Sequence, residues 1–147
     1  MKISPESFIV DENLCLKYKS IFVSGNDEGY ISTFLDLMVA AFSKNGYLRK
    51  NIDENKSVSP DLFGTGNKYV LVCNKYVGNK SVEEIEGCDD VFIFHEKTSL
   101  KNKTIKQFFS NSKARALVEC YELDQNKKKI ILNAFIKKHS LVFEKNV

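Results

Sequence analysis

The sequence predicts an α/β fold, a three-layer sandwich in which a mostly parallel sheet of about five strands has helices on both faces. Two observations predict it. Short apolar runs alternate along the chain with segments whose apolar residues recur at helical spacing. The chain has 147 residues, of which 43% are hydrophobic and 28% charged, and this suits one domain with one hydrophobic core. We therefore expect residues 1–147 to form a single domain.

The expected strands are short apolar runs that end at turn residues. Four of them are expected to be buried, namely Ser20–Ser24, Tyr69–Cys73, Val91–Phe94 and Ala116–Tyr121. Residues Tyr47–Ile52 are more polar and are expected to form a fifth, short strand. Such short runs, separated by helical segments, are typical of a parallel sheet with crossover helices.

The expected helices carry their apolar residues on one face. They are Asp27–Ser43, Thr104–Asn111 and Lys127–Lys138, with an amphipathic segment at Pro5–Leu16 and one helical turn at Ser81–Ile85. A turn or short helix is expected at Lys56–Phe63, and Asp124 is placed to cap the last helix. In that last helix we expect the inward face to hold Ile130, Ile131, Ala134 and Phe135.

Composition excludes several classes of protein. The net charge of +3 is only mildly basic, and no apolar stretch approaches the roughly 18 residues that span a bilayer. Residues Met1–Val10 contain no apolar core of a signal peptide. The four cysteines and two histidines lack the spacing of zinc ligands. We expect a cytoplasmic protein with reduced thiols, no metal, no cofactor and no membrane partner.

The turn after the first buried strand is where a fold of this kind usually binds a ligand. It reads from Ser24 to Tyr30, and its glycines, Gly25 and Gly29, do not have the spacing of a phosphate loop. It contains no lysine, while Asp27 and Glu28 would repel a triphosphate. The sequence therefore predicts that no nucleotide binds at this turn.

Two other functions remain open on the residues alone. One is an enzyme that processes a nucleotide or phosphoester at the strand ends, although the pairs Cys73 with His95 and Cys120 with His139 carry no motif. The other is weak binding of nucleic acid by the lysines that gather late in the chain. These are Lys101, Lys103, Lys106, Lys127, Lys128, Lys129, Lys137 and Lys138.

Three stretches in order resemble the N-terminal domain of the delta subunit of the bacterial DNA polymerase III clamp loader. They are Ile21–Ile31, then Leu62-Phe63-Gly64 leading through Lys68 into Tyr69–Val72, and then Ala116–Asp124. Together they extend over residues 20 to 143. The resemblance implies a degenerate, P-loop-like ATPase domain of the clamp-loader type that has lost its phosphate loop and binds no nucleotide.

That family binds the ring-shaped sliding clamp (beta) and opens it for loading on primed DNA. The resemblance places the clamp contact on Leu62 and Phe63, and implies a role in DNA replication without catalysis of the chain's own. Burying two such side chains in an apolar pocket contributes roughly 3–6 kcal/mol before the costs of association. The lid and collar domains of a whole delta subunit are absent, so we expect binding to the clamp without stable assembly with other loader subunits. Contact with DNA is expected to be weak or indirect.

Overall fold

Six parallel strands form the centre of the molecule. The computed structural model describes residues 1–52, 67–96, 102–121 and 125–139. Within these residues one sheet has the order β1-β6-β2-β5-β4-β3, and each neighbouring pair is parallel. The strands are β1 (Lys2–Ile3), β2 (Ser20–Gly25), β3 (Tyr47–Ile52), β4 (Lys68–Cys73), β5 (Val91–His95) and β6 (Arg115–Cys120). The predicted α/β class and parallel sheet are confirmed, with one strand more than expected.

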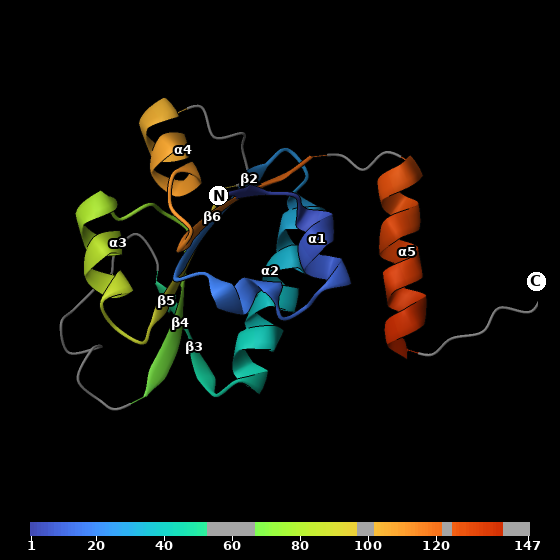
Figure 1. The fold of residues 1–147 in the computed structure, drawn as a ribbon, viewed down its shortest axis with the longest axis horizontal. Helices are drawn as coiled ribbons and strands as arrows, with labels where there is room; N and C mark the ends of the chain where they lie inside the picture. Colours follow the sequence, from blue (N-terminus) through green and yellow to red (C-terminus); the bar gives the residue numbers. More distant parts are fainter. Residues whose placement is uncertain (53–66, 97–101, 122–124, 140–147) are drawn as a thin grey trace, which may run out of the picture.

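Helices cover both faces of this sheet (Figure 1). One face carries α1 (Pro5–Val10), the short 3-10 helix η1 (Leu14–Lys17) and the long α2 (Glu28–Lys44). The other face carries α3 (Asn79–Glu86) and α4 (Lys103–Ser110). The three layers expected from the sequence are therefore present in the described residues.

The core consists of two apolar clusters, one on each face of the sheet. Side chains alternate between the faces along a strand, so Ile21 and Val23 of β2 pack under α1 and α2 while Phe22 packs under α3 and α4. All six residues of β2 are buried. Burial on both faces explains why this strand is an almost continuous apolar run in the sequence.

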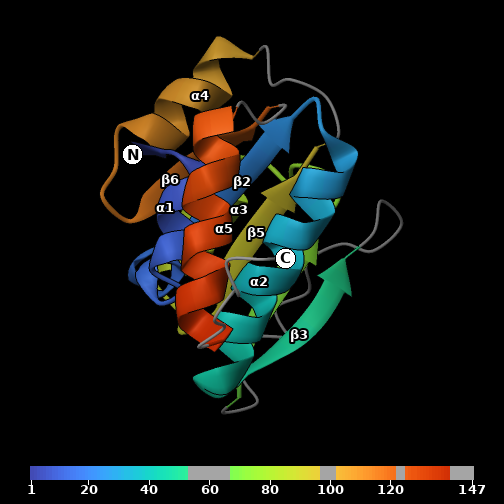
Figure 2. The same ribbon diagram turned by 90° about the vertical axis from the view of Figure 1, so that its right-hand side faces the viewer.

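Helix α5 (Gln125–His139) lies outside this sandwich, against the outer side of α1 and α2 (Figures 1 and 2). Its Ile131 and Ala134 are half-buried, but Ile130 is 44% exposed and Phe135 is 51% exposed. The predicted single inward face is therefore wrong in part. A peripheral helix is covered along one stripe only, and the apolar arc of α5 is wider than that stripe.

The first residues of the chain differ most from expectation. The segment predicted as one amphipathic unit, Pro5–Leu16, is divided into α1 and η1 at the extended residue Asp11. Strand β1 was not predicted, because two residues carry no periodic signal. It pairs with Leu117 and Val118 of β6, so the first residues of the chain are attached to the last strand of the sheet.

Candidate functional site

The turn between β2 and α2 lies at the position where parallel α/β sheets usually bind ligands. Strand β2 is central, with β5 on one side and β6 on the other. The chain leaves β2 through α2 toward β3, at one edge of the sheet. It leaves the neighbouring strand β5 through α4 toward β6, on the opposite side of β2. Where neighbouring connections turn in opposite directions in this way, a crevice forms at the carboxyl ends of the strands.

The main chain of β6 fills the space beside this turn. Gly25 has a φ of +152°, and a Cβ atom built on it would lie 2.5 Å from the carbonyl carbon of Cys120 and closer still to its oxygen. The Asn26 amide donates a hydrogen bond to the same carbonyl oxygen at 3.2 Å. Glycine is therefore required at position 25 by the close approach of its strand partner Cys120 in β6.

The first turn of α2 satisfies its own amides. Asp27 is the N-cap, and its Oδ1 accepts a hydrogen bond from the Tyr30 amide at 3.0 Å. The negative charge that favours a helix N-terminus is thus supplied by the protein, with Glu28 adding a second carboxylate. A phosphate at this turn would meet two carboxylates and a capped helix, so the geometry argues against nucleotide binding here.

A buried carboxylate lies close to the same turn. The hydroxyl of Tyr30 donates to Glu6 Oε1 at 3.3 Å, and both residues are less than a tenth exposed. Burial, then the neighbouring Glu6 and Asp27, raise the pKa of Cys120 to about 12. The same causes raise the pKa of Tyr30 well above its ordinary value. Both groups therefore stay protonated at neutral pH, so Cys120 is a poor nucleophile.

The structure does not bring Cys73 and His95 together as a catalytic pair. Cys73 packs with Phe94, its partner across the β4–β5 pair, in the cluster under α3 and α4. Since side chains alternate along a strand, His95 is directed to the opposite face. Burial also raises the pKa of Cys73 to about 12. The second pair cannot be assessed, because the side chain of His139 lies outside the described residues.

Among the described residues, the lysines that gather late in the sequence lie on different faces of the molecule. Lys106 is on α4, where it pairs with Glu119 at 3.6 Å, and α4 covers the face of the sheet opposite to α1 and α2. Lys128, Lys129 and Lys137 are exposed on α5, beyond the other face (Figure 1). A continuous strip for a nucleic-acid backbone is therefore not present in the described residues.

The predicted clamp-binding pair, Leu62 and Phe63, lies outside the described residues. The segment that contains it connects β3 to β4 in the sequence. The expected turn at Lys56–Phe63 and the expected cap at Asp124 also fall outside the described residues. These expectations remain predictions.

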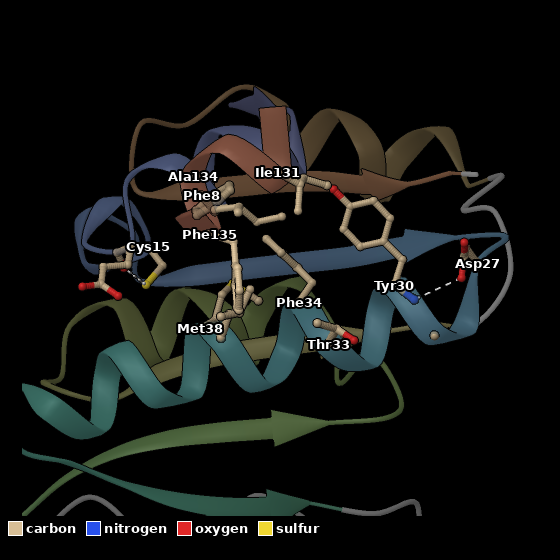
Figure 3. A pocket seen from close by; sticks show the side chains of 14 residues that line it. Phe8, Cys15, Asp27, Tyr30, Thr33, Phe34, Met38, Ile131, Ala134 and Phe135 are labelled. Atoms are coloured by element: carbon tan, nitrogen blue, oxygen red, sulfur yellow. Dashed lines mark hydrogen bonds between the residues drawn. The ribbon is translucent and has the colours of Figure 1, made fainter. Parts of the chain in front are cut away.

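A pocket that the sequence did not reveal lies between α1, η1, α2 and α5 (Figure 3). Its volume is about 520 Å³. Most of its lining is apolar, with Phe8 from α1, Phe34 and Met38 from α2, and Ile131 and Phe135 from α5. Asp27 and Tyr30 stand at one end of it, so the pocket begins beside the turn after β2. The only sequence signal was the breadth of the apolar arc on α5.

Comparison of this chain with models of known protein families and with curated proteins yields no match. Among the described residues, no helix combines the length and apolar character needed to cross a membrane. The same part of the chain contains no group of three or more histidine, cysteine or acidic side chains arranged to hold a metal ion. The function must therefore be argued from the fold and the sites above.

Proposed function

We propose that this chain is a nucleotide-free, partner-binding domain of the kind found at the N-terminus of the clamp-loader delta subunit. In this proposal it contacts the sliding clamp through Leu62 and Phe63 and opens it for loading on primed DNA. The observation that supports the proposal is the turn after β2, where Gly25 packs against the Cys120 carbonyl and Asp27 caps α2.

The strand order is consistent with this proposal. If the short β1 is left out and β2 is numbered 1, the strands β6-β2-β5-β4-β3 lie across the sheet in the order 5-1-4-3-2. This order, with a central strand followed by the long helix α2, is compatible with the ATPase-like scaffold that the resemblance to the delta family implies. In the proposal, the turn after β2 corresponds to the phosphate loop of such a scaffold, and its Asn26 amide is hydrogen-bonded to the Cys120 oxygen. A scaffold that keeps the order and closes the turn fits a domain that works by contact with a partner.

The proposal assigns no catalysis to the chain. Cys73 and Cys120 are buried and protonated, and Asp27 is engaged as a helix cap. The role is therefore one of binding energy applied to the clamp, within the DNA polymerase III machinery. Contacts with other loader subunits would be made through a collar domain, as in whole delta subunits.

The test is binding of the purified chain to a bacterial sliding clamp, measured by surface plasmon resonance. Leu62→Ala combined with Phe63→Ala is expected to weaken binding at least about 100-fold, since roughly 3–6 kcal/mol of apolar burial is removed. Magnesium and ATP at millimolar concentration are expected to leave the affinity unchanged, because no step of the binding uses nucleotide.

A matched control is available on α5. Ile130 and Leu132 are 44% and 52% exposed and do not line the pocket, so Ile130→Ala with Leu132→Ala removes two large apolar side chains from another surface. This control is expected to bind the clamp like the wild type. Equal affinity of the two double variants, or no binding by the wild type, would reject the proposal.

A further inference from the structure

The pocket between α1, α2 and α5 has the size and character of a small-molecule site. Ligand pockets in proteins measure about 300–1,000 Å³ and are mainly apolar with a few polar groups. This pocket, at about 520 Å³, falls within that range. It lies between helices, one of the usual locations for such sites.

Two of its walls belong to the rigid core. Phe8 of α1 is 5% exposed, and Phe34 and Met38 of α2 are 1% and 2% exposed. These side chains also pack against the sheet, which fixes their positions. The third wall is α5, which presents Ile131, Ala134 and Phe135 to the pocket (Figure 3). The apolar part of the site is therefore largely formed without a ligand.

The charged groups that line the pocket are of one sign. They are Asp27 at one end and Glu12, which pairs with Lys44 at 3.9 Å. Among the described lining residues there is no lysine, arginine or histidine. Behind Tyr30, the buried Glu6 accepts a hydrogen bond from the neutral tyrosine hydroxyl. Within the described part of the chain, neither Glu6 nor Asp27 forms an ion pair.

The Asp27 end of the pocket therefore attracts a cation. A helix N-terminus has about half a positive charge, which opposes this attraction. Two carboxylates, those of Asp27 and Glu28, lie at this N-terminus and counter that half charge. An anionic ligand such as a fatty acid is disfavoured at this end for the same reason.

We propose that this pocket binds a small amphiphilic cation, with its apolar chain between α1, α2 and α5 and its ammonium group beside Asp27. The proposal does not rest on clamp binding, because it is argued only from described residues of α1, η1, α2 and α5, of the link between α1 and η1 and of the turn before α2. The pocket can therefore be tested whether or not the chain binds a clamp.

The experiment compares three probes that share one alkyl chain and differ in charge. Decylammonium, decanol and decanoate are titrated separately into the full chain below their micelle-forming concentrations, and affinities are measured by calorimetry. Decylammonium is expected to bind about tenfold more tightly than decanol, as a charge-assisted hydrogen bond provides, and decanoate is expected to bind least. No binding of decylammonium at millimolar concentration, or equal affinity for the three probes, would overturn the proposal.

A charge variant isolates the role of Asp27. Asp27→Asn removes the charge but keeps a good N-cap, so the helix is retained. It is expected to lower the affinity for decylammonium about tenfold and to leave decanol unchanged. Asp36→Asn is the matched control on the same helix, because Asp36 is 77% exposed at the side chain and does not line the pocket. An equal effect of the two variants would contradict the placement of the ammonium group.

Filling variants test whether the chain itself binds in the pocket. Ala134→Phe fills the pocket from α5, and Thr33→Phe fills it from α2. Each is expected to abolish binding of both decylammonium and decanol while circular dichroism shows an intact fold. Two opposite walls are used so that displacement of α5 in one variant cannot account for the result. Unchanged binding in both filled variants would show that the probes attach to the surface, and the proposal would fail.

Discussion

Replacing Gly25 by alanine tests the feature that closes the turn after β2. A Cβ at this position would lie 2.5 Å from the Cys120 carbonyl carbon and 2.9 Å from the Cys120 nitrogen. Both are main-chain atoms of a buried strand, so no flexible side chain can move aside. The two strands must separate by roughly 1 Å or more, since the interior is close-packed.

The cost follows from three parts of this contact. Backbone strain at a φ of +152° contributes about 1–3 kcal/mol, and overpacking contributes about as much again. Weakening of the hydrogen bond from the Asn26 amide to the Cys120 oxygen adds about 1 kcal/mol. We expect Gly25→Ala to lower the free energy of unfolding by about 3–7 kcal/mol, which is a large part of the roughly 5–15 kcal/mol of a typical domain.

Two other glycines give matched controls for urea unfolding followed by circular dichroism. Gly46 has a φ of +88° but nothing within 4 Å of its built Cβ, so Gly46→Ala is expected to cost only the backbone term of about 1–3 kcal/mol. Gly29 is in α2 with its nearest neighbour at 3.6 Å, so Gly29→Ala is expected to stabilise by up to about 1 kcal/mol. If Gly25→Ala costs no more than Gly46→Ala, the close approach of β6 is refuted.

Two further predictions concern titratable groups. In the native protein the half-buried thiol of Cys88 is expected to react with a thiol reagent much faster than the other three thiols. The slow thiols are those of the buried Cys15, Cys73 and Cys120, because burial raises their pKa values to between about 11 and about 12. In urea all four thiols are expected to react. Asp90 is 3% exposed and accepts a hydrogen bond from the Tyr69 amide at 2.8 Å, and burial raises its pKa. Its contribution to stability is therefore fully present below the ordinary aspartate pKa and falls as the pH rises through the raised value. Asp90→Asn, which keeps an acceptor, is expected to be at least as stable as the wild type at neutral pH, and a clear loss of stability there would contradict this reasoning.

The sequence predicted those elements whose signal is local. Strand β2 and helix α2 were found because the apolar run ends at Gly25 and because Ile31, Phe34 and Met38 recur at helical spacing. Asp27 was expected in the first turn of α2, and the structure makes it the N-cap. The two-residue strand β1 was missed because its partner β6 is more than a hundred residues away along the chain.

The candidate sites were predicted less well, since they depend on packing between distant segments. The sequence showed that the turn after β2 lacks the residues of a phosphate loop. It did not show that Cys120 fills the space, because that contact depends on the register of β2 with β6. The pocket was missed for the same reason, as its walls come from residues as far apart as Phe8 and Phe135.

The sheet order also determines when the fold can be completed during synthesis. Strand β2 is made early, but it pairs only with β5 and β6, so Ser20 must wait for Phe92 and Arg115. Until then this buried, mainly apolar strand has no partner on either edge, and such strands promote aggregation. Pairings of this sequence separation also fold slowly. We therefore expect the nascent chain to depend on protection by the ribosome or by chaperones until residue 120 has emerged.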